Sequence, residues 1–289
     1  MESGDVVCHC NDLRPLRVLL IGLHDRFEHV LSATIQGWGY DVAILSPTCV
    51  SWGSDVEGDI LLYDLDESFR LSSLRTGKGG IMSLHPTLIP DFLKNGDESW
   101  SQIRFTIALS SLSVSRAILE QIGAIAFLQK PFAMGVLKRY LCVLQRLLME
   151  EQLSEPSSLK SGEGQGRRIL VVDDNPDVAE AIRQYLLYEP GYEVAVAYNG
   201  LEALEQCLNW SPHCIVTDLI MPWMNGYQVM RCLSGSGLRM MPAFVVMSAL
   251  LQLEVPVNRS YLKDKIVTYI HKPFQMDHLL TAIERVCPD

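Results

Sequence analysis

Residues 168–177 read RILVVDDNPD, and this stretch decides the fold of the C-terminal half of the chain. A run of apolar, β-branched residues, of the kind that lies inside a parallel sheet, ends abruptly in two adjacent carboxylates, Asp173 and Asp174. Two like charges side by side at the edge of a core are unfavourable unless an opposite charge offsets them. We therefore expect a cation beside this acidic pair.

Outward from this stretch, short apolar runs alternate with segments of helical periodicity. The predicted strands are 169–172, 194–197, 214–216, 244–247 and 267–270, and the predicted helices lie near 178–186, 201–208, 227–233 and 278–286. Strands that are apolar on both faces and alternate with helices indicate a parallel sheet covered by helices. Residues 167–289 are therefore predicted to form an α/β, doubly wound, flavodoxin-like domain with a five-stranded parallel sheet and helices on both faces.

The first half of the chain repeats this plan. LQKPFAM at 128–134 matches IHKPFQM at 270–276, and LLYDL at 61–65 matches IVTDL at 215–219. We predict strands at 18–21, 42–45, 60–63, 105–109 and 125–128, with helices near 27–35 and 136–148. Residues 15–150 are thus predicted to be a second doubly wound domain, with residues 70–100 as a surface loop.

Composition supports two ordinary domains and excludes several function classes. The chain has 289 residues, of which 48% are hydrophobic and 20% charged. The polar segment 151–166 is predicted to be a flexible linker, and residues 1–14 a disordered N-terminus, because neither has a hydrophobic period. The net charge is −10 and no basic block stands out, so we expect no direct binding of nucleic acid.

The sequence favours a cytoplasmic protein that does not enter a membrane. The N-terminus is acidic, and no apolar run approaches the roughly 20 residues of a membrane helix. Eight cysteines are scattered without a disulfide framework, which is typical of reduced, packed thiols. Cys8, His9 and Cys10 form at most half a metal site, since no second pair lies at zinc spacing.

Chemistry-bearing residues follow several predicted strands of the C-terminal half. The carboxyl ends of the strands in a doubly wound sheet meet at one crevice. The residues expected there are Asp173, Asp174, Asp218, Ser248 and Lys272. Three carboxylates, a hydroxyl and an ammonium suit a hard divalent cation, of which Mg²⁺ fits best because it takes oxygen ligands and keeps several waters.

At these positions the C-terminal half resembles a response-regulator receiver domain of two-component signalling. The resemblance is carried by VVDDNPD, YNGLEAL (198–204), DLIMPWMNGYQVM (218–230), MSA (247–249) and YIHKPF (269–274). It implies that Asp218 is the phosphoacceptor, that Mg²⁺ is held by Asp174, Asp218 and the backbone carbonyl of Ile220, and that Asp173 assists through water. Lys272 and Ser248 would stabilise the phosphoryl group, and Tyr269 would be the switch aromatic. Ile220 and Leu250 are expected to shield the acyl phosphate.

The resemblance also implies the partners. The donor would be a histidine kinase or a histidine phosphotransfer protein, and the readout would be a downstream protein target, with a homodimer left open. We expect a response regulator without an output domain, and no enzyme beyond its own phosphorylation and dephosphorylation. The chain could instead be a phosphate sink for a shared kinase, or a scaffold or adaptor that acts without phosphorylation.

The N-terminal half departs from this pattern. Gly22 and Leu23 stand where the acidic pair should be, whereas Asp64, Ser110 and Lys130 remain and Phe127 takes the switch position. One carboxylate attracts Mg²⁺ far less than three do, so we predict a degenerate receiver that is not phosphorylated by the usual route. Two further residues, Asp25 and Asp66, could in principle substitute as ligands.

Two enzyme classes give weaker matches. Asp64 and Asp66 in YDLDES resemble the nucleophile and acid/base pair of haloacid-dehalogenase-type phosphatases, but that pair follows the first strand of those sheets, and this one follows the third. TGKGG at 76–80 lacks the spacing and the Ser or Thr of a phosphate-binding P-loop. We therefore favour the receiver interpretation.

Overall fold

The computed structural model describes residues 15–22, 25–45, 57–66, 103–150, 166–236, 240–249 and 267–288. The chain divides into two compact units, Met1–Gln145 and Arg146–Asp289, and each is described by itself. Several sequence predictions lie outside the described residues: the N-terminus 1–14 with its Cys-His-Cys group, the loop 70–100, and the linker 151–166 apart from Gly166.

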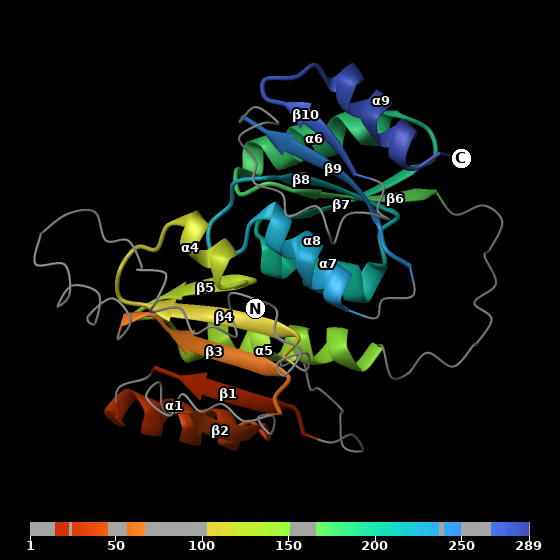
Figure 1. Ribbon diagram of the computed structural model, residues 1–289. Coiled ribbons are helices and arrows are strands. Elements are labelled where there is room, and N and C mark those ends of the chain that lie inside the picture. The colour runs from red at the N-terminus through yellow and green to blue at the C-terminus, as the bar shows by residue number, and fades with distance from the viewer. Residues whose placement is uncertain are drawn as a thin grey trace, which may run out of the picture. The chain divides into compact units, whose positions relative to one another are not determined.

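The N-terminal domain is built on a five-stranded parallel sheet (Figure 1). The strand order is β2-β1-β3-β4-β5, with β1 Arg17–Ile21, β2 Asp41–Leu45, β3 Ile60–Asp64, β4 Phe105–Ser110 and β5 Ala126–Gln129. Its helices are α1 Asp25–Gly37, α4 Arg116–Gln121 and α5 Met134–Glu150. All five strands and both helices predicted here are confirmed, whereas the short helix α4 was not predicted.

The C-terminal domain has a second five-stranded parallel sheet of order β10-β9-β8-β6-β7. Its elements are β6 Arg167–Val172, α6 Pro176–Tyr188, β7 Tyr192–Ala197, α7 Gly200–Trp210, β8 Cys214–Asp218, α8 Gly226–Gly235, β9 Ala243–Ser248, β10 Val267–His271 and α9 Met276–Val286. Numbered within each domain, both sheets have the order 2-1-3-4-5. This is the flavodoxin-like order, so the predicted fold class is confirmed for both halves.

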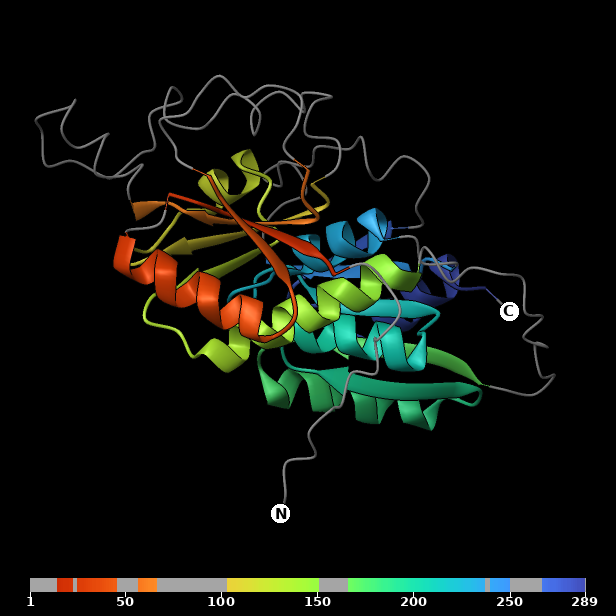
Figure 2. The same ribbon diagram turned by 90° about the horizontal axis from the view of Figure 1, so that it is seen from below.

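Helices cover both faces of each sheet, which explains why the central strands are apolar throughout. In the C-terminal domain, α6 and α9 pack on one face with alternate residues of the strands, and α7 and α8 contact each other. In the N-terminal domain, α1 and α5 lie on one side of the sheet and α4 on the other (Figure 2). The central strands β3 and β4 of the N-terminal domain are buried at every residue. Burial on both faces leaves only the strand ends for polar chemistry.

Three asparagines begin helices of the C-terminal domain. The side chains of Asn175, Asn199 and Asn225 each accept a hydrogen bond from a backbone N–H in the first turn of α6, α7 and α8. Asn225 also forms a reciprocal capping box with Gln228. The asparagines in the motifs NPD, YNG and MNG therefore have a backbone role, because they fix where each helix starts after its strand.

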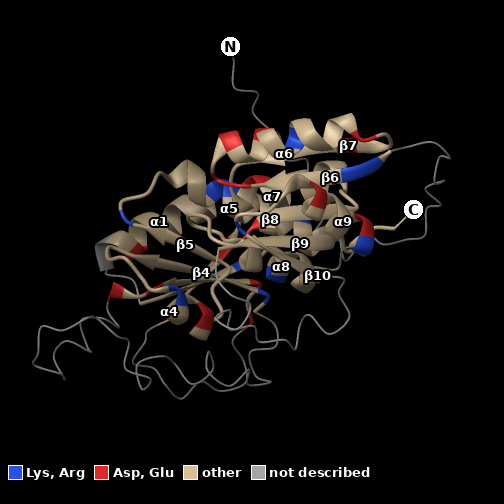
Figure 3. Ribbon diagram, turned by 90° about the horizontal axis from the view of Figure 1, so that it is seen from above, with Lys and Arg blue, Asp and Glu red and all other residues tan. Residues whose placement is uncertain are grey.

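Charged side chains are mixed in sign over the described surface. Lys and Arg occur singly or in adjacent pairs on several elements, among Asp and Glu (Figure 3). Within the described segments, no helix is both long and apolar enough to cross a membrane.

Candidate functional site

Strand register brings the polar residues of the C-terminal domain to one edge. Val172 of β6 pairs with Thr217 of β8, so the residues that follow them, Asp173 and Asp218, leave neighbouring strands at the same level. Asp218 in turn pairs with Met247 of β9, directly before Ser248. On the far side of β9, Ser248 pairs with His271 of β10, directly before Lys272. The crevice predicted from the sequence is thus formed by four adjacent strands.

Lys272 bridges two of the carboxylates. Its Nζ lies 2.9 Å from Oδ2 of Asp173 and 3.0 Å from Oδ2 of Asp218. Asp173 is only 1% exposed, and its other carboxylate oxygen, Oδ1, accepts the backbone N–H of Asn175 at 3.0 Å. A buried carboxylate needs such partners to remain charged. The cation expected beside the acidic pair is therefore present, and it is an ammonium.

Asp174 completes an acidic cluster with the same two residues. One carboxylate oxygen from each of Asp173, Asp174 and Asp218 lies within 4.8 Å of the others. Asp173 is buried, Asp218 is half-buried, and Asp174 is exposed. Hard oxygen donors this close together, one of them on an exposed residue, suit Mg²⁺, which is held by a few carboxylates and keeps its remaining waters. This donor set therefore fits the predicted ion.

Burial and Lys272 oppose each other in setting the charge of the site. Burial raises the pKa of Asp218 above its ordinary value, although the hydrogen bond and the positive charge of Lys272 act in the other direction. For Lys272, burial alone would lower the pKa, but the hydrogen bonds to Asp173 and Asp218 raise it overall. The ammonium is therefore firmly charged beside the carboxylate that was predicted to be the phosphoacceptor.

Backbone packing fixes the position of Asp218. A Cβ on Gly226, at the start of α8, would lie 2.5 Å from the carbonyl oxygen of Asp218 and 2.9 Å from Oγ1 of Thr217. That separation is too short for any side chain, so glycine allows the helix to approach the end of β8. The backbone N–H of Ile220 donates to Oδ1 of Asp218 at 3.3 Å, and the Ile220 side chain is exposed.

The remaining predicted residues of the C-terminal site lie on adjacent strands. Ser248 is buried at the end of β9, next to Lys272. Tyr269 lies in the middle of β10 and is half-buried, and its hydroxyl lies 3.4 Å from the hydroxyl of Tyr227 in α8. This tyrosine pair was not predicted from the sequence. Leu250 lies outside the described residues.

In the N-terminal domain, the same register produces a different site. Ile21 pairs with Tyr63, Asp64 with Leu109, and Ser110 with Gln129. Gly22 thus takes the place of Asp173 and has a φ of +79°, where a Cβ would lie 2.6 Å from the carbonyl oxygen of Asp64. No carboxylate side chain fits there without moving the backbone. The backbone conformation at Gly22 therefore excludes an acidic residue at this position.

Asp64, Ser110 and Lys130 are brought together as predicted, but a fourth residue joins them. Lys130 Nζ lies 2.5 Å from Asp64 and 2.9 Å from Asp66. Asp66 also accepts hydrogen bonds from Ser110 and from both the backbone and the hydroxyl of Ser111. Asp66 was considered from the sequence only as a substitute metal ligand or as half of a phosphatase pair. The side chain of Asp25 lies outside the described residues.

Aromatic side chains flank Lys130. Its Nζ lies 5.2 Å from the ring centroid of Phe27, and that ring meets Phe132 edge-on at 6.3 Å. These residues line a cavity of about 470 Å³ together with Ser111 and Pro131. Phe127, at the predicted switch position, is half-buried and packs against the core cluster that includes Leu61 and Ile118.

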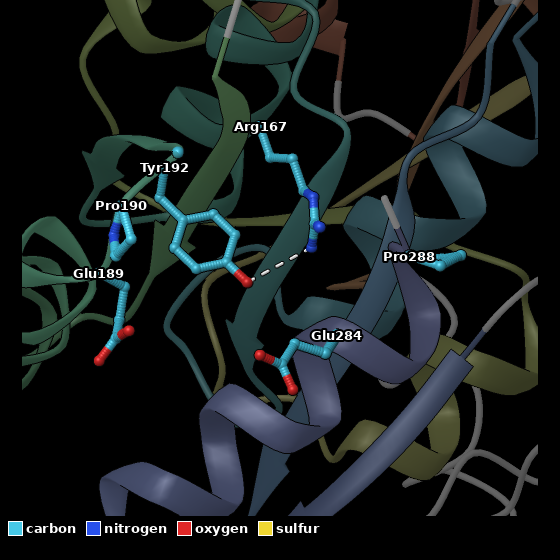
Figure 4. A pocket seen from close by; sticks show the side chains of 7 residues that line it. Arg167, Glu189, Pro190, Tyr192, Glu284 and Pro288 are labelled. Atoms are coloured by element: carbon cyan, nitrogen blue, oxygen red, sulfur yellow. Dashed lines mark hydrogen bonds between the residues drawn. The ribbon is translucent and has the colours of Figure 1, made fainter.

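A second cavity, of about 480 Å³, lies at the other end of the C-terminal sheet (Figure 4). Arg167 at the start of β6 donates to the carbonyl oxygen of Cys287 at 3.0 Å, and its guanidinium lies 5.6 Å from the ring centroid of Tyr192. Glu284 of α9 and Glu189 complete a lining of mixed charge. Arg167 thus ties the start of the sheet to the end of α9, away from the acidic cluster.

Comparison with known proteins identifies the C-terminal domain. Residues 169–284 match the family model of the response regulator receiver domain. Response regulator MprA of Mycobacterium tuberculosis (strain ATCC 25618 / H37Rv) is 35% identical over 116 residues, which cover 40% of this chain and 48% of that protein. MprA of Mycobacterium sp. (strain KMS) is 34% identical over 126 residues, covering 42% and 53%. The chain therefore spans about half the length of the curated relatives it matches.

Solved structures of receiver domains are also similar to part of the chain. A signal receiver domain from Bermanella marisrubri is 31% identical, covers 42% of this chain and 98% of its own, and has a TM-score of 0.37. The response regulator TrrA from Thermotoga maritima, in complex with Mg(2+)-BeF, is 26% identical, covers 42% and 98%, and has a TM-score of 0.36.

Residues 169–284 of this chain belong to the response regulator receiver family. The chain thus contains a receiver domain of two-component signalling, a class of domain that relays signals and is not in general enzymatic.

Proposed function

We propose that Asp218 accepts a phosphoryl group from the phosphohistidine of a histidine kinase or histidine phosphotransfer protein. A carboxylate oxygen of Asp218 bonds to phosphorus as the phosphorus–nitrogen bond of the donor breaks. The electrons of that bond stay on the imidazole, which takes up a proton. The observation that carries the proposal is the Lys272 ammonium 3.0 Å from Asp218, at the edge of a three-carboxylate cluster.

Each neighbour of Asp218 has a part in this chemistry. Asp173, Asp174, Asp218 and the backbone carbonyl of Ile220 would hold Mg²⁺, which when bound supplies positive charge to the phosphoryl oxygens. Lys272 supplies further positive charge, because phosphoryl transfer depends mainly on positioning and charge neutralisation. Asp173 anchors Lys272 through its 2.9 Å ion pair and so holds the ammonium at the crevice.

Readout would begin at Ser248. The acyl phosphate adds about −1.5 to −2 charges and strong hydrogen-bond acceptors, and the hydroxyl at the end of β9 is placed to donate to one of them. Tyr269, on the adjacent strand, would follow this movement and break its contact with Tyr227. The surface of β9 and β10 would then be read by a downstream protein.

The N-terminal half would be a receiver-like domain that does not take up phosphate. We place its limits at 15–150, joined by a linker at 151–166 to the phosphoacceptor domain at 167–289. Gly22 leaves no room for the missing carboxylate, and Lys130 is already paired with Asp64. The phosphatase alternative is disfavoured, because Asp66 is held by Ser110, Ser111 and Lys130 and is not available as an acid or base.

Labelling with a radioactive phosphodonor tests the assignment of the two halves. We expect the full chain to incorporate label from acetyl phosphate or a phosphohistidine donor when Mg²⁺ is present. Label should disappear in Asp218→Ala and persist in Asp64→Ala, which is the matched control in the other domain. Label that survives Asp218→Ala and is lost in Asp64→Ala would reverse the assignment.

The same variants distinguish a phosphorylated regulator from a scaffold. If the protein acts as a constitutive adaptor, Asp218→Ala will leave its signalling output unchanged. If phosphorylation controls the output, the variant will abolish it.

A further inference from the structure

The two domains differ at two equivalent positions beside the strand ends. Two residues after Asp64 the chain has Asp66, whereas two residues after Asp218 it has the exposed Ile220. One residue after Ser110 it has Ser111, whereas Ala249 follows Ser248. The N-terminal domain thus has a carboxylate and an extra hydroxyl where the C-terminal domain has two apolar side chains.

The carboxylate of Asp66 is surrounded by donors. Its Oδ1 accepts the hydroxyl of Ser110 and the backbone N–H of Ser111, each at 2.8 Å. Its Oδ2 accepts the hydroxyl of Ser111 at 2.7 Å and the ammonium of Lys130 at 2.9 Å. Four short hydrogen bonds to one carboxylate, one of them from a cation, make a tightly bound anion.

These donors come from the strand ends that were assigned to phosphoryl recognition in the other domain. Ser110 corresponds in register to Ser248, and Lys130 to Lys272. We propose that the Asp66 carboxylate is a built-in anion that holds Ser110 and Lys130 in the arrangement that a phosphoryl group on Asp218 would impose on Ser248 and Lys272. The comparison with Ser248 and Lys272 rests on the function proposed for Asp218. The binding of the Asp66 carboxylate by Ser110 and Lys130 does not depend on that function.

The charge of Asp66 supports this assignment. Partial burial would raise its pKa, but the hydrogen bonds from Lys130, Ser111 and Ser110 lower it to about 2. The carboxylate is therefore ionised throughout the physiological range. Because Lys130 is also bound to Asp64, both carboxylates share one ammonium, and no positive charge at this pair remains for an incoming phosphoryl group.

A second hydrogen bond of Ser110 links the Asp66 site to the loop after β4. The hydroxyl of Ser110 donates to Asp66 and accepts the backbone N–H of Leu112 at 3.0 Å. The orientation of Ser110 is thus fixed from both sides, and the loop after β4 is fixed with it. The N-terminal domain therefore presents one conformation of this loop whether or not a kinase is active.

Hydrogen exchange measured by NMR on the full ¹⁵N-labelled chain tests the proposal, with inorganic phosphate as the probe. The amides of Ser111 and Leu112 report on Asp66 and Ser110, respectively. In Asp66→Ala we expect the Ser111 amide to exchange at least about tenfold faster than in the wild type, because its hydrogen bond to a charged acceptor is lost. The Leu112 amide should also exchange faster, because the Ser110 hydroxyl that accepts it loses the carboxylate that orients it. Millimolar phosphate should then slow them again, entering through the cavity beside Ser111 and Lys130.

Three controls decide the outcome. The wild type should not respond to phosphate at these amides, because Asp66 fills the site, and Asp66→Ala combined with Lys130→Ala should not respond either. The amide of Ile107 in β4 reports whether the domain is folded. If Asp66→Ala loses that protection, Asp66→Ile replaces it, because isoleucine stands at the equivalent position of the C-terminal domain and has no acceptor, and the same increase in exchange at Ser111 is expected.

Two results would overturn the proposal. One is exchange of the Ser111 amide that stays within about twofold of the wild type in a folded Asp66 variant, since a lost charged hydrogen bond is worth more than that. The other is a wild-type response to phosphate as large as that of Asp66→Ala. Neither readout involves Asp218, so the labelling experiment can fail or succeed independently.

Discussion

Lys272 is the residue on which the charge balance of the C-terminal site depends. It pairs with Asp173, which is almost fully buried, and with Asp218. Replacing it by alanine leaves the two carboxylates without their shared cation and removes the donor that we propose for the phosphoryl oxygens. We expect Lys272→Ala to lower the rate of labelling by acetyl phosphate about 100-fold, the effect typical of a lost charge-stabilising donor.

The matched control for this prediction is Lys130→Ala in the other domain. Lys130 occupies the same register position but is paired with Asp64 and Asp66. Its loss should leave the labelling rate unchanged. If the labelling rate fell equally in Lys272→Ala and Lys130→Ala, contact with Asp218 would not explain the effect of Lys272.

Gly226 makes a second prediction at the residue scale. A methyl group there would lie 2.5 Å from the Asp218 carbonyl oxygen, and backbone atoms cannot yield as a flexible side chain does. We expect Gly226→Ala to lower the free energy of unfolding of the C-terminal domain by about 2 kcal/mol, measured by urea denaturation. Gly37→Ala, at the end of α1 in the N-terminal domain, is the control: an added Cβ would meet no atom of another element within 4 Å, so the free energy of unfolding of that domain should change by less than about 1 kcal/mol.

At the scale of elements, His213 joins the end of α7 to the sheet. It lies directly before β8, and its Nδ1 accepts the backbone N–H of Arg168 at 3.0 Å. Burial lowers the pKa of His213, and the nearby Arg168 lowers it further. Because the neutral form is favoured in the folded state, its stabilising effect is complete above the ordinary pKa of 6.5 and is lost as pH falls through the lower folded value.

We therefore expect acidification below neutral pH to destabilise the C-terminal domain. The free energy of unfolding should fall by about 1 kcal/mol, because protonation of Nδ1 removes a hydrogen bond of about that value. In His213→Asn, whose side-chain oxygen accepts the same N–H without titrating, the pH dependence of the free energy of unfolding should be smaller by this amount. An unchanged slope in that variant would show that other groups cause it.

The elements were largely predictable from the sequence, and the reason is physical. Strands buried on both faces must be apolar throughout, as 169–172, 214–216 and 244–247 are. The existence of these strands, and the positions of Asp173, Asp218 and Ser248 at or just beyond their ends, therefore follow from the residues alone. Helix α4 has six residues, too few to show a clear period, and it was missed.

The role of Asp66 was less accessible from the sequence. Its partners Ser110 and Ser111 lie 44 and 45 residues further along the chain, and the donors converge only because β3 and β4 are adjacent in the sheet. The backbone conformation of Gly22 is likewise a property of the folded turn. The adjacent hydroxyls of Ser110 and Ser111, where the other domain has Ser-Ala, were the one available signal.

At the scale of the whole molecule, the same fold occurs twice with different charges at the equivalent edge of the sheet. The C-terminal domain gathers three carboxylates around one lysine, which leaves an excess of negative charge for a metal ion to neutralise. The N-terminal domain gathers two carboxylates, one lysine and two hydroxyls, so its polar groups satisfy one another. The two domains should therefore respond differently to the same ion.

Mg²⁺ should accordingly stabilise only the C-terminal domain. A ligand that binds the folded state alone stabilises it by RT ln(1 + [L]/Kd), which is about 1.4 kcal/mol at a concentration about ten times the Kd. We expect hydrogen exchange in peptides covering β6 and β8 to slow on addition of Mg²⁺ and to regain its original rate when EDTA chelates the ion. The exchange rate of peptides covering β1 and β3 should not change. Asp174→Asn, which removes the exposed carboxylate without disturbing the Asp173–Lys272 pair, should weaken this response. If Mg²⁺ slowed exchange equally in both domains, or if Asp174→Asn responded as the wild type does, the ion would not be held by this cluster.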